Sequence, residues 1–242
     1  MRYQKFAITF FAACALFFTS CASENAKSKF SIAPDGEISG TVVIDAGTCD
    51  ELGNPSGSWL RMIEPGGNVL TGPYITNYDS NCSEQSFSLL SPGKVGLKLG
   101  EFQRHPNPAF DAATNGLADE IFSPVRFYSV NFAISTESQP EKIGSALSPP
   151  RFFVESTGDE GSPKNVRLTA NLQSLFVGWN GEFFEQGGPH PEGFTGATTT
   201  PFGNINLETG QFTLQWSSQV DAGSFDGFIG QWQLTGVLIP NK

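Results

Sequence analysis

The chain has 242 residues and a formal net charge of −10, and 38% of its residues are hydrophobic, including 22 Phe and four Trp. This much apolar material can form a real core, which excludes wholesale disorder. An acidic chain without a basic patch is repelled by nucleic acid and by anionic bilayers, so we expect no nucleic-acid partner.

The N-terminus has the pattern of an export signal. Met1–Lys5 is short and basic, Phe6–Phe18 is apolar except for Thr9, and small residues follow in Thr19–Ser23. A basic start, a short apolar run and a small-residue exit are typical of a secretory signal, and the run is too short to span a bilayer as a mature helix. We therefore predict a signal peptide over residues 1–20.

The end of this leader resembles that of bacterial lipoprotein precursors. Phe18-Thr-Ser-Cys21 is similar to a lipobox, with Phe18 where leucine is usual. The resemblance covers the leader only. It implies that Cys21 is lipid-modified and anchors the protein to a membrane, and Ala22 at the next position implies sorting to an outer membrane where the organism has one. A second box ending at Cys14 would leave an apolar run of only about eight residues. Ordinary cleavage after Ala22, followed by secretion, is the alternative.

Residues 21–35 are rich in Ser, Lys and Ala without periodicity, which indicates a flexible tether. Residues 36–242 are expected to form a single β-rich domain that contains Cys49 and Cys82. Two such cysteines in an exported protein most often pair. Closing a loop of about 33 residues would stabilise the fold by roughly 3–4 kcal/mol. Free thiols are one alternative, and a metal or catalytic site is another, although the close C-x-x-C spacing of many metal sites is absent.

Alternating apolar and polar residues predict strands along the domain. The first covers 37–45, and others follow at 58–63, 74–78, 85–90, 95–102 and 121–135. The last of these has aromatics on both faces and is expected to be buried on both sides. Residues 166–172 and 175–179 alternate in different phases, which indicates a β-bulge near Gln173. Polar, proline-containing stretches mark a candidate sub-domain seam near 136–165.

The strongest alternation lies near the C-terminus. Gln211–Trp216 and Gln231–Gly236 each place apolar residues on one face and Gln or Thr on the other. The glycine-rich segment between them indicates a long or bulged hairpin connection. Together with 27 Gly and 16 Pro, this pattern predicts an all-β fold, most simply an antiparallel β-sandwich, with a β-barrel as the alternative.

One segment is similar to a calcium-binding loop. Asp111, Asn115 and Asp119 would supply oxygens at the first, fifth and ninth positions, with Gly116 at the sixth. The third position is alanine and the twelfth is phenylalanine, where calcium loops need oxygen ligands. Asn-Gly is also a common turn sequence. We expect a turn here, keep calcium as the weaker alternative, and predict no cofactor.

A second group of polar residues follows Trp179. Glu182, Glu185, His190 and Glu192 would suit a metal, acid–base chemistry or a pair of carboxylates around a glycosidic bond. A solvated acidic loop explains the same residues, and we favour it. Trp179, Glu182, Glu185 and His190 remain the candidate ligand-binding residues.

The four tryptophans have two interpretations. Trp59, Trp179, Trp216 and Trp232 would suit a sugar-stacking platform on a sheet. Their alternation with Gln and Thr favours core packing, above all for Trp216 and Trp232. Gly57-Ser-Trp59 also resembles the short G-x-W near the start of lipocalin barrels, some of which are bacterial lipoproteins.

Catalytic motifs are scarce in the sequence. We find no nucleophile elbow, no Walker motif and no dinucleotide-binding glycine pattern. We therefore expect no catalytic residues and a non-enzymatic, lipid-anchored envelope protein that serves as a structural module or binds a glycan or a protein. A carrier of small hydrophobic ligands and a hydrolase using the carboxylates of residues 182–192 are the alternatives.

Overall fold

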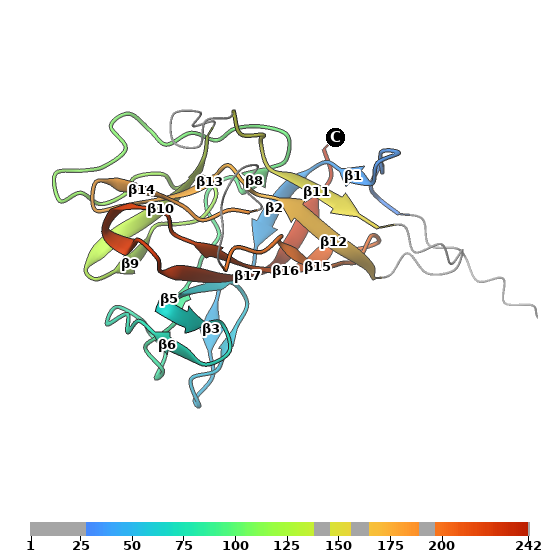
Figure 1. The fold of residues 1–242 in the computed structure, drawn as a ribbon. Coiled ribbons are helices and arrows are strands. Elements are labelled where there is room, and N and C mark those ends of the chain that lie inside the picture. The colour runs from blue at the N-terminus through green and yellow to red at the C-terminus, as the bar shows by residue number, and fades with distance from the viewer. Residues whose placement is uncertain (1–27, 138–145, 156–164, 189–196, 242) are drawn as a thin grey trace, which may run out of the picture.

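The computed structural model describes residues 28–137, 146–155, 165–188 and 197–241. Within them the fold is all-β, with one short 3-10 turn, η1 (Gly223–Phe225), as the sole helical element. No helix among these residues is long and apolar enough to cross a membrane. A large curled antiparallel sheet lies beneath a smaller one (Figure 1). The predicted all-β class is confirmed, and the facing sheets fit the predicted sandwich.

The large sheet has the strand order β1-β11-β12-β15-β16-β17-β2-β8, with β5 pairing β17, and with β6 and β7 pairing β5. Its strands are β1 (Glu37–Ile38), β2 (Thr41–Ile44), β5 (Trp59–Asn68), β6 (Gly72–Tyr74), β7 (Ser88–Leu89), β8 (Leu97–Lys98), β11 (Arg151–Val154), β12 (Val166–Asn171), β15 (Phe202–Ile205), β16 (Gln211–Gln219) and β17 (Ile229–Ile239). The four-stranded sheet, in the order of pairing, consists of β14 (Glu182–Glu185), β13 (Leu175–Trp179), β10 (Val130–Thr136) and β9 (Val125–Phe127). A separate hairpin joins β3 (Thr48–Cys49) and β4 (Pro55–Ser56).

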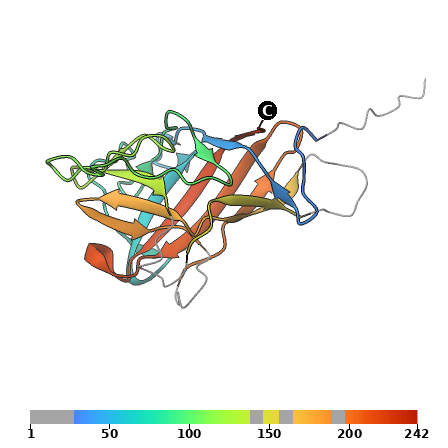
Figure 2. The ribbon, with the colours of Figure 1, turned by 90° about the horizontal axis from the view of Figure 1, so that it is seen from above.

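The predicted C-terminal hairpin forms the centre of the large sheet. β16 and β17 pair without interruption from Gln211↔Val237 to Gln219↔Ile229. On its other edge, β17 pairs with β5 along its first half and with β2 along its last four residues. Figure 2 shows these long strands running diagonally across the molecule. The alternation in this part of the sequence therefore identified the strands that hold the sheet together.

The core lies between the two sheets. The large sheet contributes buried residues that include Phe152, Leu168, Phe212, Leu214, Trp216, Trp232 and Leu234, and the smaller sheet contributes Phe132, Ile134, Leu175 and Val177. The rings of Trp216 and Trp232 stack with centroids 5.4 Å apart and planes 2° from parallel. Both indoles are almost fully buried. Core packing of these two tryptophans is confirmed.

The phase change predicted as a β-bulge near Gln173 is a corner between the sheets instead. The chain leaves the large sheet after β12, turns with a hydrogen bond from Leu175 N to Leu172 O (2.9 Å), and enters the smaller sheet as β13. Both leucines are fully buried. The alternation changes phase because each strand must point its apolar side toward the same core from opposite sheets. The single strand predicted over 121–135 is wrong, because a turn at Tyr128 and Ser129 divides it into the antiparallel strands β9 and β10. Burial on both sides holds only in β10, where all residues from Phe132 to Thr136 are buried.

Residues 45–90 include a disulfide lobe on the outside of the large sheet, opposite the smaller sheet (Figure 1). Cys49 and Cys82 form the predicted disulfide, with Cα atoms 5.5 Å apart. Beside it, Trp59 packs edge-to-face on Phe87 at 5.1 Å. The guanidinium of Arg61 lies over the Tyr74 ring at 3.8 Å. The lobe therefore has a small core of its own, built on the outer face of β5.

Several predicted segments fall partly outside the described residues. The signal peptide and Cys21 lie there, as do 138–145 and 156–164 of the predicted seam. Between those two stretches, β11 pairs with β1 and β12 in the large sheet. At the end of the predicted tether, Phe30 is buried, and Lys29 N donates to Leu207 O (3.1 Å). The described part of the tether is thus docked on the domain.

Candidate functional site

Of the carboxylates predicted near Trp179, the two that the structure describes, Glu182 and Glu185, do not come together. Glu182 and Glu185 are three residues apart on β14, so the two-residue period of a strand directs them to opposite faces. The Glu182 carboxylate accepts hydrogen bonds from the backbone N–H (3.0 Å) and hydroxyl (2.9 Å) of Ser224. Glu185 is buried. His190 and Glu192 lie outside the described residues.

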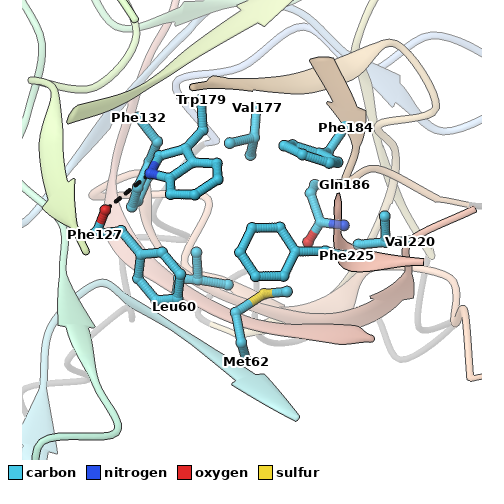
Figure 3. Close-up of a pocket in the computed structure, with 10 residues that line it drawn as sticks. All are labelled: Leu60, Met62, Phe127, Phe132, Val177, Trp179, Phe184, Gln186, Val220 and Phe225. Atoms are coloured by element: carbon cyan, nitrogen blue, oxygen red, sulfur yellow. Dashed lines mark hydrogen bonds between the residues drawn. The ribbon is translucent and has the colours of Figure 1, made fainter. Parts of the chain in front are cut away.

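Trp179 lines an apolar chamber between the sheets. Its indole N–H donates to Phe127 O (2.9 Å), and its ring points into the chamber (Figure 3). The other lining residues, which come from both sheets and from the β16–β17 loop, are Leu60, Met62, Phe127, Phe132, Val177, Phe184, Gln186, Val220 and Phe225. The cavity measures about 30 Å³, which is room for one or two water molecules. A drug-sized ligand needs ten times that volume or more, so a hydrophobic ligand would fit only if the lining side chains moved apart.

The predicted calcium loop forms a hydrogen-bonded turn. The Asp111 carboxylate accepts the backbone N–H groups of Ala113 (2.8 Å) and Asn115 (3.0 Å) and the Asn115 side-chain amide (3.1 Å). Asp119 pairs instead with Lys94 at 2.5 Å. In the described part of the chain, no group of three or more His, Cys, Asp or Glu could hold a metal ion. Asp111 and Asn115 therefore come together and Asp119 does not join them.

The same turn occurs at Asp50 and Asn54, and the two turns predict a common response to acid. A side-chain hydrogen bond from Asn54 lowers the pKa of Asp50 below its ordinary value of 3.8, and one from Asn115 does so for Asp111. Because the folded pKa lies below the unfolded one, this stabilisation is present above about pH 4 and lost as pH falls through the folded pKa. NMR titration should give both carboxyls midpoints below 3.8. In Asn54→Ala, the Asp50 midpoint should rise; an unchanged midpoint would contradict the assignment.

The outer face of the large sheet carries a ladder of polar side chains around one exposed ring. Strand alternation directs the following side chains away from the core: Arg167, Thr169, Phe202, Asn204, Thr213, Gln215 and Gln233. Phe202 is directly opposite Thr169 on one side and Gln215 on the other. Facing residues on adjacent strands have Cβ atoms about 5 Å apart. The polar groups therefore lie next to the ring on both sides.

All of these side chains except Thr169 border a hollow of about 550 Å³ on the outer face. The disulfide lobe lies on the same side of the sheet below β17, while the described chain leaves β12, β15 and β16 uncovered there (Figure 1). The Phe202 side chain is 43% exposed. Asn204, Thr213 and Gln215 make no side-chain hydrogen bond within the described residues. We call this region the outer-face hollow.

The sequence pattern predicts part of this region. The alternation of 211–216 and 231–236 correctly directed Gln and Thr away from the core, but it indicated only contact with water. Phe202 was missed because no strand was predicted between residues 179 and 211. Its pairing with β12 and β16 places it among those amides. A signal was present in Phe202-Gly-Asn-Ile205, which alternates, but four residues cannot identify a strand by themselves.

Compared with protein-family models, with curated proteins and with solved structures, the chain matches none.

Proposed function

We propose that the protein is a non-enzymatic module of the cell envelope, anchored through lipid on Cys21, that binds a neutral polysaccharide in the outer-face hollow. One observation carries the proposal: the exposed ring of Phe202 lies among amide and hydroxyl groups that have no partner within the described residues. The disulfide supports export, because such bonds persist in oxidising compartments.

The chemistry of the hollow suits a sugar chain. A flat aromatic face packs against the apolar face of a pyranose ring, and the side-chain amides of Asn204 and Gln215 can both donate to and accept from hydroxyl groups. A hydroxyl-rich chain also tolerates a wet surface, because water can bridge the remaining polar groups. An open sheet face admits the middle of a long chain as readily as its end.

The charges favour a neutral ligand. The net charge of −10 opposes a polyanionic polysaccharide. Arg167, the cation that lines the hollow, forms an ion pair with Glu155 at 3.7 Å, which offsets its positive charge. The remaining polar side chains that border the hollow are uncharged amides and hydroxyls. Uncharged hydroxyl groups are therefore the complementary ligand chemistry.

The Phe202→Thr variant tests the proposal. Threonine is also favoured in strands but lacks the ring, so we expect the protein to stay folded and to lose affinity for polysaccharide by about 10-fold or more, as for a central aromatic in an interface. Affinity gel electrophoresis through a panel of neutral polysaccharides, including envelope glycans, measures the retardation.

Ile239→Thr supplies the matched control. Ile239 is an exposed apolar residue of the same sheet, at 50% exposure, and lies at the far end of β17. This variant should be retarded like the wild type. Equal retardation of Phe202→Thr and the wild type would reject the site, and a wild type that no polysaccharide retards would reject the function.

A further inference from the structure

A second feature, remote from the sheet face, lies at the turn between β9 and β10. Phe127 pairs with Val130, so Tyr128 and Ser129 form a two-residue hairpin turn. Both have left-handed backbones, with φ of 50° and 62°. Turns of this kind strongly prefer Asn-Gly, because a side chain with a bulky Cβ substituent is strained there. Closing the hairpin therefore does not explain why tyrosine occupies this position.

Neighbouring segments hold this turn in place. The Ser129 N–H donates to the Asp79 carboxylate (2.6 Å), and the Arg126 guanidinium donates to Ser129 O (3.2 Å). From β13 of the smaller sheet, the Trp179 indole N–H donates to Phe127 O. Strained residues persist where the surrounding structure fixes them, and such residues concentrate at functional sites. The turn is fixed by the disulfide lobe on one side and the smaller sheet on the other.

The strained turn presents an aromatic pair to solvent. Tyr128 and Tyr78 lie edge-to-face with ring centroids 6.2 Å apart. Tyr78 is 72% exposed and Tyr128 is 41% exposed. Partial burial, with smaller contributions from Tyr78 and Glu64, raises the pKa of Tyr128. The pair is therefore an exposed aromatic surface, with Tyr128 carried on the turn that Asp79 and Arg126 hold.

A polar hollow of about 360 Å³ lies beside the turn, and its lining residue Asp79 directly follows Tyr78 in the chain. Asp79 and Arg126 line the hollow and also hold the turn, and Asn81, Ser91 and Ser123 are among the other lining residues. The side chains of Asn81 and Ser91 make no hydrogen bond within the described residues. The charges of Asp79 and Arg126 are close to balanced, because their side chains are 3.7 Å apart. The hollow offers hydroxyl, amide and carboxylate groups, while the rings of Tyr78 and Tyr128 lie outside its lining.

We infer that Tyr78, Tyr128 and this hollow form a second binding site, the tyrosine site, for a single sugar residue. Its ring face packs on Tyr128, and its hydroxyls reach Asp79 and Asn81. The balanced charges disfavour an ionic ligand, and the volume suits a small one. This site is distinct from the outer-face hollow, and its evidence does not depend on the proposed polysaccharide binding.

The test uses Tyr128→Asn and Tyr78→Ala. Asparagine is well tolerated in a left-handed turn, so the first variant removes the ring and keeps the hairpin; an unchanged or raised thermal unfolding midpoint confirms this. The probes are the methyl glycosides of common neutral hexoses and N-acetylhexosamines, added to the oxidised protein. Saturation-transfer NMR followed by titration should show a wild-type complex whose affinity falls at least 10-fold in each variant.

Leu70→Ala is the matched control, because Leu70 is 86% exposed and lies at another turn of the same lobe. It should bind the probes like the wild type. Wild-type affinity in Tyr128→Asn would overturn the tyrosine site, and so would the absence of any methyl-glycoside complex. Loss of the complex in Phe202→Thr but not in Tyr128→Asn would assign the sugar to the outer-face hollow and would also overturn the inference.

Discussion

Replacing Trp232 with alanine is expected to lower the free energy of unfolding by about 3–5 kcal/mol, the usual cost of truncating a large buried aromatic residue. Trp232 is fully buried and stacks on Trp216 at the centre of the large sheet. The change would leave a cavity between the sheets. It would also remove the indole N–H that donates to Gln186 Oε1 (3.1 Å). Equilibrium unfolding in urea measures the loss.

Trp232→Phe separates the two contributions. Phenylalanine keeps a ring in the core but leaves the Gln186 Oε1 atom without the indole donor, at a cost of about 1–3 kcal/mol. The neighbouring network stays in place, because Trp216 N–H donates to the Gln186 backbone O (2.8 Å). The alanine variant should therefore be clearly less stable than the phenylalanine variant. A loss below about 1 kcal/mol in Trp232→Ala would contradict the central position of this hairpin in the core.

Removal of the Cys49–Cys82 disulfide is expected to lower the free energy of unfolding by about 2–4 kcal/mol. The bond closes a loop of 33 residues and belongs to the small core of the disulfide lobe. Because that core is built on the outer face of β5, the lobe should become mobile before the large sheet opens. The Cys49→Ser/Cys82→Ser double variant, compared with the wild type in urea, measures the loss.

Amide hydrogen exchange locates the effect of that double variant. Faster exchange should be concentrated in residues 45–90, with β16 and β17 protected as in the wild type. Wild-type protein treated with a reducing agent is the control, and it should behave like the double variant. Stability equal to that of the oxidised wild type would show that the disulfide does not stabilise the lobe.

Local patterns in the sequence predicted the main features of the fold. The alternation of Gln211–Trp216 with Gln231–Gly236 was enough to identify the central hairpin, because a half-buried strand repeats every two residues. The disulfide followed from the number and context of the cysteines. The same two-residue period could have separated Glu182 from Glu185, which are close in sequence but directed to opposite faces of β14.

The candidate sites depend on pairing between distant segments, which one sequence does not reveal. Phe202 is surrounded by amides only because β15 lies between β12 and β16. Tyr78 and Tyr128 meet because a loop of the disulfide lobe reaches the β9–β10 turn. That turn has no Asn-Gly or Asp-Gly, so its position could not be read from turn preferences. Strand periodicity and turn preferences along the sequence therefore did not predict either site.

The most direct test of the account follows the side-chain amides of Gln215 and Asn204 by NMR during titration with a polysaccharide fragment that retards the wild type. If the outer-face hollow binds polysaccharide, both resonances shift together and saturate with one dissociation constant. The Asn68 side-chain amide, in the disulfide lobe and outside the hollow, stays unchanged. Saturation of the protein without any shift of Gln215 or Asn204 would contradict binding on the outer face of the large sheet.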